Sequence, residues 1–245
     1  MKEKPTRETR ISGKDLAALN MPDFCPRCFW IKRKTKALPY QIFPGIFSTI
    51  DGYTKALVHA HFDTYGIAPA SMAEALGEAQ DYLKPPSWQK FQRRDDVTGI
   101  IVSGSLDGYF IREDGSRIIP DYKTAKHTEG QDKLLPLYEA QLNAYRWIDE
   151  GFGNVVHSTP LIYCEPQALD TLTSDPRFIE DPYRLTGFEM LFSTKTVFIE
   201  NKPDLIPSLL VRAKEILDMP EAPDSSEGCK DCEKLDDLVR LVVNG

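Results

Sequence analysis

The sequence predicts a mixed α/β fold, and three observations support this class. Apolar residues recur at helical spacing over 50–65 and again over 134–149. Three strand-like runs lie between these two helices: 97–103, 105–112 and 117–124. Asp114 and Gly115 separate the last two runs as a hairpin turn would. Helix, three strands and helix in this order indicate a mixed sheet with flanking helices.

The remaining elements are expected around this centre. They are a short helix capped by Ser12 that runs to 20, a helix over 73–83, a buried strand over 155–164, an extended segment over 188–200 and a helix over 204–218. In the helix over 50–65 the spacing places six residues on one inward face: Ile50, Thr54, Leu57, Val58, His61 and Tyr65. By the same spacing His59 does not point inward. Cys164 lies in an apolar run and is expected in the core.

Length and composition indicate an ordinary globular protein. The 245 residues are 41% hydrophobic and 27% charged, which predicts a single domain over 1–245 with its core at about 50–165. No apolar run reaches the roughly 18 residues of a membrane helix. The charged start is unlike a signal peptide, so we expect a cytoplasmic protein with no membrane partner.

The net charge of −7 argues against a protein that coats nucleic acid, but not against one that grips a few phosphates. Basic residues crowd one short segment near the start, interleaved with Phe29 and Trp30: Arg27, Lys32, Arg33, Lys34 and Lys36. This pattern suits a phosphate-binding surface and an ordinary solvated face equally well.

The clearest chemical signal is Asp121 with Lys123. Side chains alternate along a strand, so these two share a face while Tyr122 points into the opposite layer. If the neighbouring strand brings Asp107 alongside, two carboxylates meet beside one ammonium, and Mg²⁺ or Mn²⁺ would relieve their repulsion. Such a site suits phosphodiester hydrolysis, because the cation lowers the pKa of a bound water while the lysine neutralises developing charge. An exposed hairpin with a surface ion pair is the competing interpretation.

The surrounding motifs resemble the RecB-like branch of the PD-(D/E)XK nucleases. They are Gly104-Ser-Leu-Asp107, Asp121-Tyr-Lys123 and Gln141-Leu-Asn-Ala-Tyr145, in the order and at the gaps of that family. The resemblance covers residues 97–165 and implies a restriction-endonuclease-like core with flanking helices. The aspartate of the family's "PD" corresponds to Asp107 rather than to Asp121. Pro120 removes a ladder donor, which is typical of a sheet edge or bulge.

The resemblance also implies roles for individual residues. The implied metal ligands are Asp107, Asp121, the carbonyl of Tyr122 and, on the preceding helix, His61. Lys123 is the implied catalytic lysine. Gln141 and Tyr145 are implied to contact the substrate or to brace the site.

Four cysteines form two CxxC pairs near opposite ends of the chain: Cys25, Cys28, Cys229 and Cys232. In a cytosolic chain this spacing predicts a metal site, which would join the N- and C-terminal segments. Four thiolates suit either a tetrahedral Zn²⁺ or a [4Fe–4S] cluster. The resemblance to the CRISPR-associated exonucleases and to AddB favours the iron–sulfur cluster, although those proteins place one cysteine early and three late.

Together these features predict a divalent-metal-dependent DNA nuclease. The resemblance implies an exonuclease acting on ends or single-stranded DNA, in repair, recombination, or mobile-element or CRISPR processing. The chain has no GxxxxGK[ST] motif, so a helicase would be a partner in trans. The alternative is a catalytically inactive nucleic-acid-binding or scaffold protein with a structural zinc site.

Overall fold

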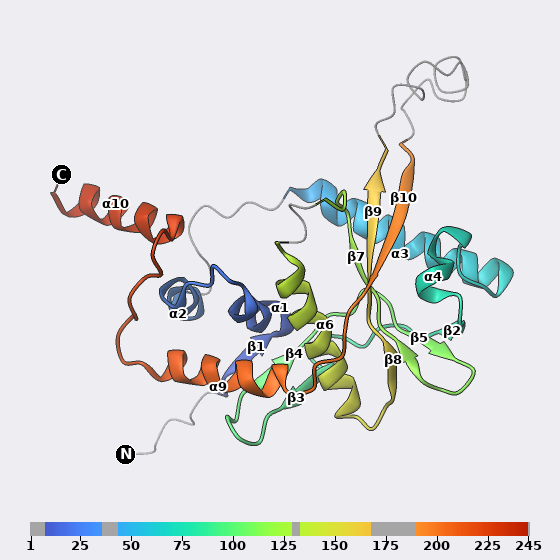
Figure 1. Cartoon of the computed structure of the whole chain (residues 1–245), viewed down its shortest axis with the longest axis horizontal. Helices are drawn as coiled ribbons and strands as arrows, with labels where there is room; N and C mark the ends of the chain where they lie inside the picture. The colour runs from blue at the N-terminus through green and yellow to red at the C-terminus, as the bar shows by residue number, and fades with distance from the viewer. Residues whose placement is uncertain (1–7, 36–43, 129–132, 168–189, 245) are drawn as a thin grey trace, which may run out of the picture.

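A computed structural model of the chain describes residues 8–35, 44–128, 133–167 and 190–244. Its strands form three mixed sheets with helices on both sides (Figure 1). This arrangement confirms the predicted α/β class. No helix within the described ranges is long and apolar enough to cross a membrane.

The first sheet has the order β1-β4-β3. It consists of β1 (Arg10–Ser12), β4 (Ile101–Ser103) and β3 (Gln92–Arg94). Ser12 caps α1 (Gly13–Ala17), because its side chain accepts a hydrogen bond from Asp15 N at 3.0 Å. The turn continues as η1 (Ala18–Asn20), so the predicted helix is confirmed. The run predicted from 97 begins only at β4, and the two outer strands were not predicted.

The second sheet has the order β2-β5-β6-β8. Its strands are β2 (Ala79–Tyr82), β5 (Phe110–Arg112), β6 (Arg117–Ile118) and β8 (Val156–Ser158). The predicted hairpin joins β5 to β6, with Gly115 at φ +79° and Asp114 Oδ1 accepting from Ser116 N at 2.9 Å. The helix predicted over 73–83 is wrong beyond its first turn. The chain forms η2 (Ala70–Met72) and then α4 (Ala73–Leu76). It continues as strand β2, which pairs with β5.

The third sheet has the order β10-β9-β7. Its strands are β7 (Asp121–Lys123), β9 (Pro160–Pro166) and β10 (Phe192–Phe198). The runs predicted over 117–124 and 155–164 are each divided between the second and third sheets, and a proline lies at each division: Pro120 and Pro160. A proline cannot donate to a strand ladder, which favours a change of partner there. The two runs are parallel to each other in both sheets: β6 pairs with β8 in the second sheet, and β7 pairs with β9 in the third.

Helices enclose β7 and β9 from two sides (Figure 1). On one side lie α1, α6 (Leu135–Glu150) and α9 (Leu205–Asp218), and on the other lie α3 (Gly45–Tyr65) and α4. Leu161 and Tyr163 are buried toward α6, whereas Tyr122, Ile162 and Cys164 are buried toward α3. This alternation confirms that Tyr122 points into the layer opposite Asp121. Helices α6 and α9 match their predicted ranges closely, while α2 (Pro26–Thr35) and α10 (Lys230–Asn244) were not predicted.

The buried face of α3 differs from the predicted one. Thr54, Val58 and Phe62 are its buried residues. Leu57 is 50% exposed and Tyr65 is 67% exposed, so their predicted inward position is wrong. The helix is therefore rotated about its axis relative to the expectation, because Phe62 packs into the cluster with Phe110 and Tyr122.

Candidate active site

Asp107 lies in the loop that joins β4 to β5, not on a strand as predicted. The loop can pass close to its neighbours because it contains glycines. A Cβ at Gly104 would lie 2.8 Å from Tyr145 Cε1, and one at Gly108 would lie 2.8 Å from the proline ring that precedes β7. This approach brings Asp107 to β7, where its Oδ2 accepts a hydrogen bond from Tyr122 N at 3.0 Å.

Asp121 and Lys123 share one face of β7. Lys123 Nζ lies 2.5 Å from Asp121 Oδ2, and the Asp121 side chain is only 4% exposed. Asp121 Oδ1 accepts a hydrogen bond from Gln141 Nε2 at 2.9 Å. Apart from this contact with Lys123, Oδ2 accepts no hydrogen bond from the described residues. A buried carboxylate oxygen in this state is well suited to a cation.

Gln141 and Tyr145 lie one helical turn apart on α6. Gln141 Nε2 also donates to Tyr145 OH at 3.0 Å, and both residues are buried. Because the Tyr145 ring packs against Gly104, a continuous chain of contacts runs from Gly104 through Tyr145 and Gln141 to Asp121. The two α6 residues thus brace the site. Their contact with a substrate stays a prediction.

Helix α3 contributes a second lysine that the sequence did not single out. Lys55 Nζ lies 2.7 Å from Asp107 Oδ1 and 2.6 Å from Asp51 Oδ2. Asp51 and Lys55 are four residues apart and lie beside the buried stripe of α3. Only the correct rotation of that helix could have indicated them, since an i,i+4 pair on its own is typical of any solvated helix face.

The charges of these groups oppose one another at close range. Burial raises the pKa of Asp121 to about 6, and the negative charge of Asp107 adds to this effect, although Lys123 and Lys55 work against it. Burial alone would lower the pKa of Lys123, but Asp121 overcomes that and raises it. Lys55 behaves in the same way, with Asp107 as the partner that raises its pKa. Both lysines therefore remain cationic.

Aromatic residues lie on both faces of β7, with Tyr138 beside Lys123 and Tyr122 on the opposite face. Lys123 Nζ lies 4.6 Å from the centroid of the Tyr138 ring on α6, a cation–π contact. The Tyr122 side chain lies in the α3-side core, where burial raises the pKa of its hydroxyl. The role of the Tyr122 carbonyl as a metal ligand stays a prediction.

The histidines of α3 do not lie as predicted. His61 Nδ1 lies 2.8 Å from Ile67 O, and its ring packs 4.7 Å from that of Tyr65. His59 instead packs inward, stacked on Tyr82 at 4.2 Å, and burial lowers its pKa. These contacts of His61 hold the end of α3 and involve neither Asp107 nor Asp121. They give no support to His61 as a further ligand, which stays untested.

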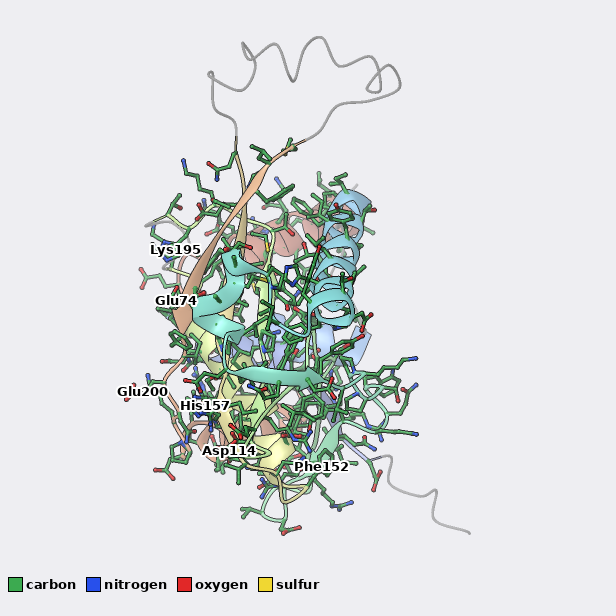
Figure 2. The ribbon with its side chains drawn as sticks, turned by 90° about the vertical axis from the view of Figure 1, so that its right-hand side faces the viewer. Glu74, Asp114, Phe152, His157, Lys195 and Glu200 are labelled. Carbon is green, nitrogen blue, oxygen red and sulfur yellow. The ribbon has the colours of Figure 1, made fainter. Side chains whose placement is uncertain are left out.

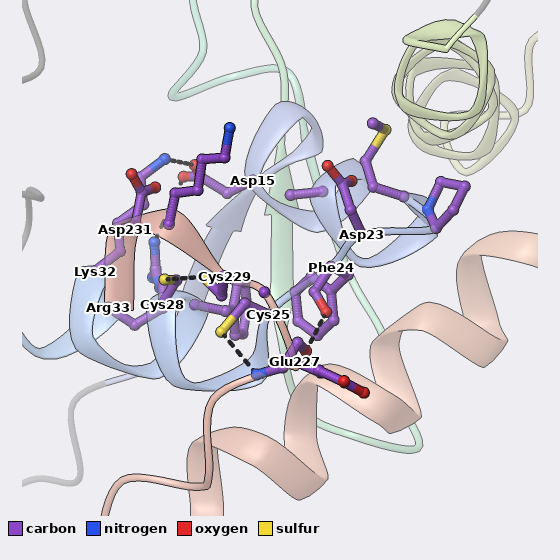
Figure 3. A pocket seen from close by; sticks show the side chains of 17 residues that line it. Asp15, Asp23, Phe24, Cys25, Cys28, Lys32, Arg33, Glu227, Cys229 and Asp231 are labelled. Carbon is purple, nitrogen blue, oxygen red and sulfur yellow. Dashed lines mark hydrogen bonds and ion pairs between the residues drawn. The ribbon is translucent and has the colours of Figure 1, made fainter. Parts of the chain in front are cut away.

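The four cysteines of the two CxxC pairs converge, as predicted, at the contact between α2 and the start of α10. Figure 3 labels Cys25, Cys28 and Cys229 of this cluster. Their sulfur atoms all lie within 4.8 Å of one another, with Cys25–Cys232 at 3.6 Å, Cys28–Cys229 at 3.5 Å and Cys28–Cys232 at 3.4 Å. All four are free of disulfides. The cluster joins the N- and C-terminal segments and is suited to bind a metal.

The thiol environments differ. Burial alone would raise the pKa of Cys25, but the backbone N–H groups of Cys28 and Ser226 lower it to about 6. The Ser226 N–H donates to Cys25 Sγ at 3.4 Å. Burial raises the pKa values of Cys28 and Cys232. A thiol of low pKa gives up its proton readily, which favours metal binding.

A cavity of about 680 Å³ opens beside these cysteines, lined by residues of α2 and by 226–231 (Figure 3). The basic segment of α2 borders it. Arg27 forms two hydrogen bonds with Asp236 of α10, and Lys32 and Arg33 contact Asp15. These basic side chains are therefore engaged in structural ion pairs. Lys36 lies outside the described residues.

Comparison with known proteins finds distant structural likenesses. No family model matches the chain, and no curated protein matches it. One similar solved structure is that of a protein called SSO0001, with 13% identity and a TM-score of 0.40, over 90% of this chain and 82% of that one. Another is a phage-related exonuclease from Haemophilus somnus 129PT, with 14% identity and a TM-score of 0.38, over 86% of this chain and 94% of that one. Likenesses this distant do not bear on what the chain does.

Proposed function

We propose that this chain is a divalent-metal-dependent deoxyribonuclease of the PD-(D/E)XK type, in its RecB-like branch. The observation that carries the proposal is the meeting of Asp107, Asp121 and Lys123, braced by Gln141, from three separate segments. An ordinary surface ion pair would not bury Asp121 to this degree. The further restriction to an exonuclease that acts on ends or single strands follows the motif resemblance.

Asp107 and Asp121 would hold Mg²⁺ or Mn²⁺, which supplies a Lewis acid and lowers the pKa of bound water. Lys123 presents an ammonium group beside the same carboxylates, where it stabilises negative charge on a phosphodiester. Gln141 fixes one oxygen of Asp121 and leaves the other toward Lys123. The protein thus orients the ligands by hydrogen bonds of its own.

The cysteine cluster would hold a single tetrahedral ion, Zn²⁺. Four thiolates that share one zinc lie about 3.8 Å apart, because each Zn–S bond is about 2.3 Å long. Three of the separations in the structure, 3.4, 3.5 and 3.6 Å, are close to this value, and all four sulfurs lie within 4.8 Å of one another. In a [4Fe–4S] cluster each thiolate binds a different iron at the outside of a cube, which requires a wider spread. We therefore favour zinc over the iron–sulfur cluster that the resemblance implied.

The test is cleavage of linear duplex, circular duplex and single-stranded DNA with Mn²⁺, with Mg²⁺ and with excess chelator. We expect metal-dependent loss of linear or single-stranded DNA and none with Asp121→Asn. DNA binding without cleavage would instead indicate the catalytically inactive alternative. Absence of both, with one zinc per chain, would indicate a scaffold protein.

Metal analysis and colour test the cysteine site separately. Anaerobically purified protein should be colourless with about one zinc per chain. A brown protein that contains iron would restore the iron–sulfur cluster.

A further inference from the structure

The third sheet carries a row of residues from the candidate catalytic lysine to the surface. Lys123 on β7 is paired with Tyr163 on β9, and Tyr163 is paired with Lys195 on β10. Paired residues of neighbouring strands project from the same face of a sheet. Strands lie about 4.8 Å apart, so this row spans about 10 Å.

The contacts along the row agree with this register. Tyr163 is 1% exposed, and the His127 ring meets it edge to face at 5.0 Å. Lys195 Nζ lies 3.0 Å from His127 Nδ1. His127 N donates to Glu165 Oε1 at 2.7 Å, which fixes the chain just beyond β7. His127 and Lys195 thus lie together above the buried tyrosine.

Lys195 differs from the basic residues of α2 in its contacts. Those residues meet carboxylates of Asp15 and Asp236. Within the described ranges, the Lys195 ammonium contacts an imidazole nitrogen of His127 rather than a carboxylate, and its side chain is exposed on β10 (Figure 2). Its positive charge therefore remains available to an anion from solvent.

Lys195 lies on the face of β10 away from the helices that pack against this strand in the described part of the chain. The opposite face is covered by η2 and α4, where Thr194 Oγ1 donates to the carbonyl oxygen of Ser71. An anionic strand that reaches Lys123 along the sheet would therefore pass Lys195 on the same face.

We propose that Lys195, oriented by His127, forms a subsite for a backbone phosphate of a DNA strand, one or two nucleotides from the bond at Lys123. This inference rests on the proposed function for the position of the cleaved bond. The ligand is the phosphate itself, so the subsite contributes affinity and direction without base preference.

The experiment measures binding rather than cleavage. Fluorescein-labelled single-stranded oligonucleotides are titrated by anisotropy in Ca²⁺, at several salt concentrations, with wild type, Lys195→Ala, Lys195→Arg and Lys214→Ala. Lys214 is a matched control because it is a surface lysine of α9. Lys195→Ala should weaken binding several-fold and reduce the salt slope by about 0.7, the contribution of one phosphate contact on a single strand. Lys195→Arg and the control should bind like wild type.

A second series places one uncharged methylphosphonate at successive positions of the oligonucleotide. At one position, the methylphosphonate should weaken binding to the wild type as much as Lys195→Ala does. At that same position, it should not weaken binding to the Lys195→Ala variant any further. Equal losses in wild type and variant at every position would overturn the subsite.

The two proposals fail differently. Coupled losses in a protein that does not cleave DNA with Mn²⁺ would support the subsite and contradict the nuclease. Cleavage by the wild type, together with an unchanged salt slope in Lys195→Ala, would support the nuclease and contradict the subsite. Failure of wild type to bind DNA would overturn both.

Discussion

The carboxylate site and the cysteine cluster both join distant parts of the chain, but they balance charge in different ways. Asp107 and Asp121 already have partners in the protein: two lysines, Gln141 and a backbone N–H group. The four sulfurs of the cluster chiefly face one another, and Ser226 N donates to Cys25 Sγ from outside the CxxC pairs. The first site is therefore organised by groups of the protein itself, whereas the second would need a bound cation to balance the charge of four thiolates. The predictions below test that difference.

The largest effect is expected from loss of the cysteine-bound metal. The cluster closes almost the whole chain into a loop and anchors α10, so Cys229→Ser or a strong chelator should cost about 3–5 kcal/mol of stability. The midpoint temperature of thermal unfolding should fall by about 10 °C or more. Differential scanning calorimetry measures this, with Cys164→Ser as the control whose loss is limited to core packing. An unchanged unfolding temperature after zinc removal would show that the cluster does not stabilise the fold by joining the N- and C-terminal segments.

The carboxylate site should show the opposite behaviour, with a large change in activity and little in folding. Asp107→Ala, Asp121→Ala and Lys123→Ala should each reduce Mn²⁺-dependent cleavage by about two to three orders of magnitude, a cost typical of losing one electrostatic group at a reacting centre. Circular dichroism should remain that of wild type. If Asp121→Ala cleaves DNA at the wild-type rate, these residues are not the active site.

Acidity provides a smaller and graded test. The pKa of Asp121 is raised to about 6 by burial. The pKa of this carboxyl is higher in the folded state than in the unfolded state. Its contribution to the free energy of unfolding is therefore fully present below about pH 4 and is lost as the pH rises through about 6. Metal binding has the opposite sign, since it requires the carboxylate. Mn²⁺ affinity should therefore fall roughly tenfold per pH unit below about 6. Isothermal titration measures it, and an affinity that is flat from pH 5 to pH 8 would contradict a role for Asp121 as a ligand.

The sequence predicted the two sites to different extents. Motif order identified Asp107, Asp121, Lys123 and Gln141, which the structure brings together, because each motif carries its own spacing. It could not show that Pro120 divides a predicted strand between two sheets, since that depends on which partner strand is available. The regular CxxC pattern identified the cysteines without any knowledge of the fold.

The rotation of α3 is the main feature that the sequence could not establish. Apolar residues surround this helix, so Leu57 was as plausible an inward residue as Phe62. Phe62 is buried because it packs against Phe110, a contact between segments far apart in the chain. The same rotation carries Lys55 to Asp107 and turns His61 away.

Lys55 gives the smallest expected effect and the sharpest test of the comparison. Three carboxylates, Asp51, Asp107 and Asp121, meet two ammonium groups, so the site has one net negative charge. A divalent cation would reverse that sign, and a phosphodiester would then meet net positive charge. Lys55→Gln removes this balance and leaves the loaded site neutral, so the KM for DNA should rise several-fold.

The same substitution removes a cation that competes for Asp107, so Mn²⁺ should bind several-fold more tightly in Lys55→Gln. Lys55→Arg keeps the charge and should behave like wild type in both measurements. A purely structural role for Lys55 would predict weaker metal binding and a lower unfolding temperature instead. Tighter Mn²⁺ binding together with weaker DNA binding can arise only if this lysine acts through charge, which is the property that distinguishes the carboxylate site from the cysteine cluster.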